Sequence, residues 1–203
     1  MPDKTAAAEH QILDLIAQRW SPRAFSPQVV DPEEVRRLFE AARWAPSCYN
    51  EQPWSFFVAA IDDPARHERL ASCLGSGNAW ARKAPVLALS VAALDFAKSG
   101  KPNRWAYHDV GLAMENLVLQ ATSMSLLAHQ MAGFDVERAR SILEIPPRYD
   151  PVGMVAVGHL GDPESLSEEQ RLKELSTRQR KPIDQFVFGE KWPEISPLVE
   201  RNR

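Results

Sequence analysis

The sequence predicts a single α+β domain with a mixed central sheet flanked by helices and one long buried helix. Three observations support this fold class. Short β-branched and apolar segments, typical of strands, alternate with amphipathic segments, typical of helices. One helical segment, over about residues 104–123, is apolar around most of its circumference, as expected for a helix in the core. No internal repeat and no long linker divides the chain, so residues 1–203 are expected to form one domain.

The individual elements follow from periodicity and capping residues. Apolar residues at helical spacing indicate a first helix over residues 7–19. Asp31 is a suitable N-cap and Pro32 a suitable first residue for a second helix, which ends before Pro46 in a proline-rich loop. The later elements are, in order, a strand at 55–60, a helix from 63 to 75, a strand at 86–93, the long helix at 104–123, a short link or strand at 125–129, a helix at 135–143, a strand at 152–158 and a charged helix at 168–177.

The C-terminal tail carries apolar side chains outside any helical pattern. Phe186, Val187, Phe188 and Trp192 lie among prolines and charged residues. Such a group of apolar side chains needs a surface to cover it. The tail is therefore expected either to fold back on its own chain or to reach across a partner subunit.

Composition and charge argue against several classes of protein. The chain carries 24 Lys and Arg against 27 Asp and Glu, a net charge of −3, which argues against an electrostatic nucleic-acid binder. The N-terminus lacks the apolar core of a signal peptide, and the longest apolar run, residues 86–94, is too short to cross a membrane. Two cysteines do not make a disulfide framework, so Cys48 and Cys73 are expected to be packed thiols of a cytoplasmic protein.

Familiar catalytic and binding motifs are absent from the sequence. It contains no glycine-rich dinucleotide or phosphate loop and no Gly-x-Ser-x-Gly nucleophile motif. The five histidines do not fall into metal-ligand spacings, so no metal site is expected. Scattered arginines, amides and one turn remain as candidates.

Two arginine clusters could hold a phosphate. Arg19, Ser21 and Arg23 lie within five residues and are stiffened by Pro22, and Arg178 and Arg180 precede Pro182. Guanidinium groups bind phosphate through charge-assisted, often bidentate hydrogen bonds. Taken alone, each cluster is equally consistent with a solvated helix end, where a cation complements the helix C-terminus.

Amides and one turn are the other candidates. Asn50, Gln52 and Asn78 offer both donors and acceptors, which suits the edge of a planar heterocycle. The turn at residues 131–133 could point backbone N–H groups into a site. The alternatives are loop-closing hydrogen bonds for the amides and a plain strand-to-helix turn.

Taken in order, these segments resemble the nitroreductase family of FMN-dependent flavoproteins. The match spans roughly residues 12–188, nearly the whole chain. The matching segments are Arg19-x-Ser21-x-Arg23-x-Phe25, then Ala45-Pro46-Ser47-x-x-Asn50-x-Gln52-Pro53-Trp54-x-Phe56, Asn78, Ala84-Pro85-Val86, Asp109-x-Gly111-x-Ala113-x-x-Asn116-Leu117, His129-Gln130-Met131-Ala132-Gly133-Phe134-Asp135 and Arg180-Lys181-Pro182.

The resemblance implies a homodimer with FMN at the subunit interface and a C-terminal extension that wraps the partner. It assigns the flavin phosphate and ribityl chain to Arg19, Ser21, Arg23, Arg178 and Arg180. It assigns the loop that the partner lays against the flavin to Pro46, Ser47, Cys48 and Asn50. The family often has Ser in place of Cys48, so a polar role for that thiol is expected to be weak.

The resemblance also implies how the flavin ring is held. Asn78 would read the pyrimidine edge, and the turn formed by Met131, Ala132 and Gly133 would address flavin N5 and O4. Arg82 and Lys83 are candidates for a positive charge near N1. Flat substrates could lie against the aromatic residues Tyr49, Trp105 and Phe134.

The implied function is that of an FMN-dependent oxidoreductase. Hydride would pass from NAD(P)H through flavin N5, in a ping-pong cycle, to an electron-poor small molecule such as a nitroaromatic or a quinone. No catalytic side chain is then required, since the cofactor carries the chemistry. Other reactions of the superfamily, such as reductive dehalogenation, enoate reduction or flavin fragmentation, and a flavin-binding module with little turnover are the alternatives.

Overall fold

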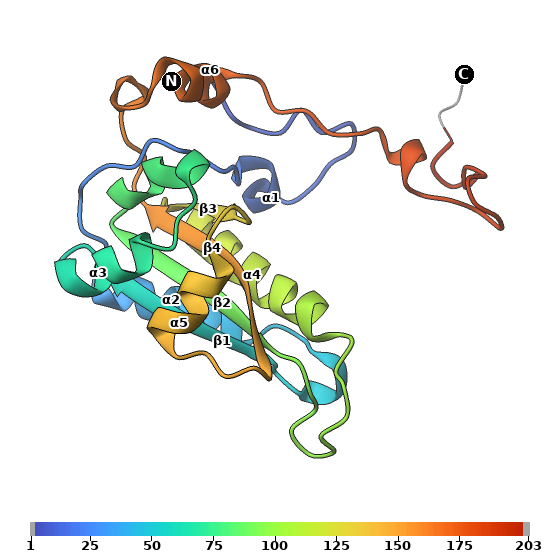
Figure 1. Cartoon of the computed structure of the whole chain (residues 1–203). Coiled ribbons are helices and arrows are strands. Elements are labelled where there is room, and N and C mark those ends of the chain that lie inside the picture. Colours follow the sequence, from blue (N-terminus) through green and yellow to red (C-terminus); the bar gives the residue numbers. More distant parts are fainter. Residues whose placement is uncertain (1–2, 201–203) are drawn as a thin grey trace.

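A four-stranded sheet forms the centre of the computed structural model, which describes residues 3–200 (Figure 1). The strands are β1 (Trp54–Ala60), β2 (Val86–Ala93), β3 (Leu127–Met131) and β4 (Tyr149–Gly158), in the spatial order β1-β2-β4-β3. The expected α+β class is confirmed. The sheet itself differs from the mixed one that was expected, because all its pairings within the described residues are antiparallel. The β1–β2 connection shows why: β1 ends at Ala60 directly opposite the first residue of β2, Val86, so the chain re-enters the sheet at the end it left.

Helices cover both faces of the sheet. On one face lie α2 (Pro32–Arg43) and α4 (Ala106–Ser123), and on the other α3 (Pro64–Ala71) and α5 (Val136–Leu143). Alternate residues of β2 enter the two cores, Val86 and Ala88 on the α4 side and Leu87 and Leu89 on the α3 side. Because β2 is covered on both faces, it reads in the sequence as a continuous apolar run.

The long helix α4 is buried, as its sequence predicts. Val110, Ala113 and Leu117 are at most 1% exposed. The helix packs against both α2 and the sheet, which explains why its apolar positions surround most of its circumference. The cap of α2 is also confirmed: Asp31 accepts a hydrogen bond from the N–H of Glu33 and forms a capping box with Glu34.

The first predicted helix is shorter than expected. Helix α1 covers only Asp14–Gln18, and residues 7–13 are not helical. The chain before α1 instead runs back along it, and the N–H of Ala6 donates to the carbonyl of Ala17. The sequence also gave no sign of the 3₁₀ segment Ser76–Lys83, which carries the buried Trp80. At residues 7–13, tertiary contacts therefore override the helical periodicity of the sequence.

The C-terminal part leaves the body of the molecule. After α6 (Glu168–Leu175) the chain extends away from the sheet (Figure 1). Phe186, Trp192 and Leu198 are 57%, 83% and 95% exposed. The tail contains a local contact between the rings of Phe188 and Trp192, 4.3 Å apart, but most of its apolar surface stays uncovered in the single chain.

Among residues 3–200, we find no helix that combines the length and the apolar character needed to cross a membrane.

Candidate functional site

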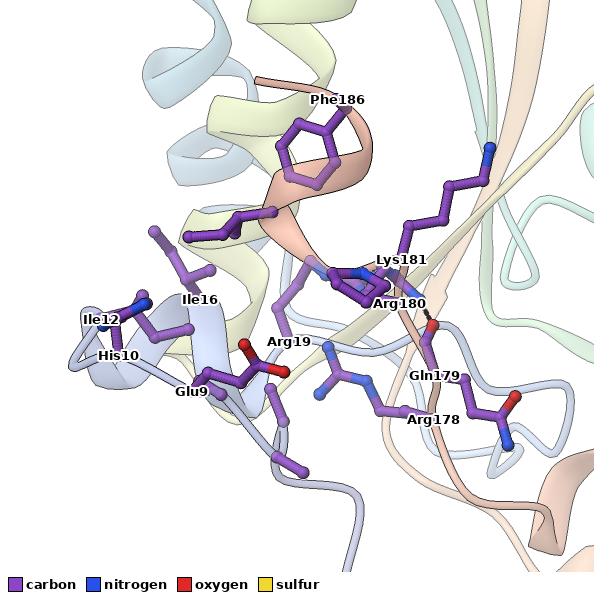
Figure 2. A pocket seen from close by; sticks show the side chains of 15 residues that line it. Glu9, His10, Ile12, Ile16, Arg19, Arg178, Gln179, Arg180, Lys181 and Phe186 are labelled. Carbon is purple, nitrogen blue, oxygen red and sulfur yellow. Dashed lines mark hydrogen bonds between the residues drawn. The ribbon is translucent and has the colours of Figure 1, made fainter. Parts of the chain in front are cut away.

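Three arginines from opposite ends of the sequence meet beside one cavity. Arg19 follows α1, and Arg178 and Arg180 follow α6. All three line a cavity of about 390 Å³, a volume within the usual range for small-molecule sites. Figure 2 shows them on one side of it, with Ile12 and Ile16 across from them. The structure thus joins the two arginine clusters that were separate candidates in the sequence.

The arginines repel one another. Burial lowers the pKa of Arg19; the negative charge of Glu115 opposes this effect, and the positive charge of Arg180 adds to it. Burial likewise lowers the pKa of Arg178, and Arg19 and Arg180 lower it further. Guanidinium groups remain charged near neutral pH regardless. Like charges gathered in a partly buried site favour a bound anion.

A second cavity lies next to the first and shares the three arginines. It has a volume of about 350 Å³ and is also lined by Lys4, Ser21 and Arg23. Within it, Nη1 of Arg19 donates to Oγ of Ser21 at 3.1 Å. Ser21 and Arg23 therefore join the arginine cluster, as the sequence motif suggested.

Hydrogen bonds between the two ends of the chain hold the arginine cluster together. Nη1 of Arg178 donates to the carbonyls of Lys4, at 2.6 Å, and Ala17, at 2.7 Å. The Nζ of Lys4 donates to the carbonyl of Ser176 at 2.5 Å. Nη1 of Arg180 likewise donates to the carbonyl of Gln179 at 2.8 Å, so Arg178 and Arg180 are each partly committed to the backbone, whereas Nη1 of Arg19 donates to the side chain of Ser21. Lys4 was not singled out in the sequence, where it belongs to no motif.

His129 on β3 contacts the segment that carries Ser21 and Arg23. Its Nδ1 is 2.7 Å from the carbonyl of Pro22, and its ring packs on Trp80 with centroids 4.6 Å apart. Burial lowers the pKa of His129 to about 4, and the nearby Arg23 and Arg19 contribute to the shift. A neutral ring that donates from Nδ1 fits this site, since a carbonyl can only accept. The sequence motif contained His129 but gave no role for it.

Asn78 and the turn at residues 131–133 are brought into contact. Nδ2 of Asn78 donates to the carbonyl of Gly133 at 2.9 Å, and the N–H of Gly75 donates to the same oxygen at 3.1 Å. A Cβ added to Gly133 would lie 2.8 Å from Nδ2 of Asn78, so a larger residue at this position would displace the Asn78 carboxamide. Met131 is buried at the end of β3, whereas Ala132 is exposed. The second group of predicted site residues therefore assembles within one chain.

The loop at residues 46–52 lies at the other end of the sheet (Figure 1). It precedes Trp54, which pairs with Ala92 near the end of β2 opposite Val86. The eight residues of β2 separate these ends by about 24 Å. One chain therefore does not bring Pro46, Ser47, Cys48 and Asn50 to the arginines.

The backbone of that loop is strained, and hydrogen bonds hold it in place. Tyr49, Asn50 and Gln52 have φ angles of 54°, 56° and 53°, in the left-handed region that costs energy for residues other than glycine. The buried carboxylate of Asp109 accepts from the N–H of Cys48 at 2.9 Å, and Oγ of Ser47 accepts from the N–H of Gln52 at 3.0 Å. Tyr49, at the tip, is 91% exposed. The loop is also in contact with residues 96–97, through the rings of Tyr49 and Phe96, 6.1 Å apart, and a hydrogen bond from the N–H of Ala97 to Glu51, so its shape is fixed although its tip is exposed.

The remaining candidates are spread over the molecule. Arg82 donates to the carbonyl of Ala71 and pairs with Glu68, and Nζ of Lys83 donates to the carbonyl of Ser165 at 3.1 Å. Both cations are thus engaged away from the arginine cluster. Trp105 lies at the start of α4. Phe134 directly follows Gly133 and forms an isolated antiparallel bridge with Leu74. Cys73 is fully buried, and burial raises the pKa of its thiol, as expected for a packed cysteine.

Comparisons with known proteins agree with the fold. The model of the nitroreductase family matches residues 16–78 and 60–159. Protein DrgA of Synechocystis is 32% identical over 174 residues, covering 71% of this chain and 82% of that protein. An NADH dehydrogenase of Thermus thermophilus is 28% identical, covering 70% and 83%. A crystal structure of an oxidoreductase containing FMN superposes with a TM-score of 0.88 at 29% identity, over 96% of this chain and 99% of that one.

Proposed function

The chain belongs to the nitroreductase family, and from that premise we propose that it is an FMN-dependent oxidoreductase. It would use NAD(P)H to reduce an electron-poor small molecule such as a nitroaromatic or a quinone, in a ping-pong cycle. A similar structure contains FMN, and one relative is an NADH dehydrogenase, which supports both parts of the proposal.

The observation that carries the proposal is the meeting of Arg19, Arg178 and Arg180 beside Ser21. These residues fit a flavin phosphate, because a group with close to two negative charges would relieve the repulsion among the arginines. Arg23, at the edge of the second cavity, adds a further positive charge. When bound there, FMN would supply hydride transfer at its N5 atom.

Residues on the β3 side would hold the flavin ring. One N–H of the Asn78 carboxamide is committed to Gly133, so its other N–H and its oxygen would serve the pyrimidine edge. The same hydrogen bond fixes the peptide of Gly133, which orients the backbone from Met131 through Ala132. That turn would present N–H groups toward N5 and O4 without the need for any particular side chain.

A second copy of the chain would complete the site. The loop with Pro46, Ser47, Cys48 and Asn50 is preformed, yet it lies at the opposite end of β2, a strand of about 24 Å, from the arginines of its own chain. In a homodimer the loop of one subunit would cover the flavin held by the other. The tail from Phe186 onward would wrap the partner. The exposure of its apolar side chains favours this over a tail that folds back on its own chain.

The first experiment is to denature the purified protein and identify any released flavin by chromatography. We expect FMN, close to one per chain, and NADH or NADPH oxidation that depends on an added quinone or nitroaromatic. Protein without flavin after expression with excess riboflavin, and unable to take up FMN, would contradict the proposal. Bound FMN without turnover for any acceptor would instead indicate a flavin-binding module.

A further inference from the structure

A buried carboxylate lies behind the arginine cluster and has no part in the proposed hydride transfer. Glu174, in the last turn of α6, has a side chain that is 0% exposed. A carboxylate is costly to bury unless hydrogen bonds replace its water. Its neighbours on this helix, such as Glu168 and Glu169, face solvent. The burial of Glu174 therefore needs a specific reason.

The partners of Glu174 are backbone amides of the other arginine segment. The N–H of Arg23 donates to both carboxylate oxygens, at 3.0 and 2.9 Å, and the N–H of Ala24 donates to Oε1 at 3.1 Å. Nη1 of Arg23 is 3.9 Å from Oε2, at the limit of an ion pair. The strong contacts are thus to the main chain, which leaves the guanidinium of Arg23 available to the cavity.

These hydrogen bonds connect the two halves of the arginine cluster. Arg178 and Arg180 follow directly from the helix that carries Glu174, and Arg19 and Ser21 precede the amides that it binds. His129 holds the same segment on its other side through Pro22. The segment at residues 21–24 is therefore clamped between β3 and α6.

We infer that Glu174 is a positioning residue for the phosphate subsite: its carboxylate fixes the backbone at Arg23 and Ala24, and thereby sets Ser21 and Arg23 against Arg178 and Arg180. This inference rests on the proposed function. Glu174 is part of the wall of the second cavity, but its side chain is 0% exposed, so it is not placed to contact a ligand there directly. It acts through the amides that it orders, so its loss would weaken recognition of the phosphate more than recognition of the flavin ring.

The test compares FMN with riboflavin, which lacks the phosphate, in fluorescence titrations of the full-length chain. For Glu174→Gln and Glu174→Ala we expect a tenfold to hundredfold loss in FMN affinity, about the contribution of one charge-assisted hydrogen bond, with the larger loss in the Ala variant. Riboflavin affinity should change by less than about threefold. A merely structural role would weaken both ligands alike and leave their ratio unchanged.

Glu168→Gln is the matched control, since it removes one negative charge from an exposed position of the same helix and should leave the FMN-to-riboflavin ratio unchanged. If the wild type prefers FMN and both Glu174 variants keep that preference, the inference is wrong while the proposed function stands. If the wild type binds FMN and riboflavin equally, the phosphate subsite itself is wrong.

Hydrogen exchange on the wild-type protein provides a readout that needs no variant. The amides of Arg23 and Ala24 should exchange slowly because Glu174 accepts their hydrogens. Exchange of the peptide over residues 22–25 at the rate of an unstructured chain would overturn the inference, even if both variants failed to fold.

Discussion

At one end of the sheet, Arg19, Arg178 and Arg180 converge from the two ends of the chain, whereas at the other end the loop at residues 46–52 projects Tyr49 into solvent. The arginine end has its cations in place and cavities beside them. The loop end has a fixed, strained backbone and borders a different cavity, lined by Glu51 and Gln52. Strain of this kind persists only where the surrounding contacts impose it.

The comparison teaches that each end supplies what the other lacks. A cation cluster without a cover leaves a planar cofactor open to water, and the loop holds an exposed residue, Tyr49, on a backbone that its own contacts keep fixed. Joining the arginine end of one subunit to the loop end of another would satisfy both. The following predictions test that arrangement, in order of decreasing effect.

Removal of the chain from Phe186 onward should have the largest effect. The tail is exposed in the single chain, so its loss should leave the fold intact while it removes the contacts to the partner. We expect a monomer that releases its flavin, in place of a dimer with an interface above about 2,000 Å². Size-exclusion chromatography with absorbance at 450 nm measures both quantities. A truncated protein that stays dimeric and yellow would show that the tail does not wrap the partner.

Replacement of the arginines should come next. Arg19→Ala or Arg180→Ala should weaken FMN binding by about tenfold to hundredfold, or about 1.5–3 kcal/mol, since each removes a charge-assisted bond to the phosphate. Arg19→Lys should restore only part of the loss, because an ammonium group lacks the planar fork. Fluorescence titration measures the affinity. Arg66→Ala, at an exposed arginine paired with Asp63 on α3, is the control and should have no effect.

Acid should destabilise the arginine end through His129. Its pKa is about 4 in the folded chain against 6.5 in the unfolded chain, so folding favours the neutral ring. The resulting stability is complete above pH 6.5 and is lost as the pH falls toward 4, by about 2 kcal/mol at pH 5. Urea unfolding at pH 7 and pH 5 measures the loss. His129→Asn keeps a donor for Pro22 but does not titrate, so its pH dependence should be smaller by that amount; an equal dependence would contradict the assignment.

Mixed dimers should give the smallest signal and the sharpest test of the two-chain site. Arg19→Ala damages the arginine end of both sites in a homodimer, and Asn50→Ala damages the loop end of both. In a heterodimer of the two variants one site is intact and the other carries both changes, so random mixing restores about a quarter of all sites. Flavin binding that stays at the level of the separate variants would place the whole site within one chain.

The sequence predicted the fold class and several helices because burial and helix capping leave direct signatures in the sequence. The apolar circumference of α4, the capping box at Asp31 and the continuous apolar run of β2 each follow from contacts that the structure contains. The expectation of a mixed sheet was wrong because strand direction depends on where each connection re-enters the sheet, as between Ala60 and Val86. The periodicity of apolar residues does not record this.

The candidate site was predicted less completely. The arginine motifs identified side chains, but the groups that hold them, Lys4, Glu174 and the ring of His129, look in sequence like ordinary charged or polar residues. In a charged helix such as α6, the sequence does not show which Glu is buried; only the packed structure shows that it is Glu174. The shortness of α1 has a similar origin, since the hydrogen bonds from Ala6 and Arg178 to the carbonyl of Ala17 are long-range contacts that the spacing of apolar residues does not record.

The bonds that assemble the arginine cluster also bear on the order of events during synthesis. Lys4 and Ser176, Lys4 and Arg178, and Arg23 and Glu174 are separated by 172, 174 and 151 positions. Contacts of such separation are slow to form, and a ribosome releases the chain from its N-terminus. A nascent chain can complete β1, β2 and α4 while Arg180 is still in the exit tunnel. The proposed anion site can therefore form only after Arg180 has left the ribosome, and the segments made before it cannot be stabilised by a ligand bound there.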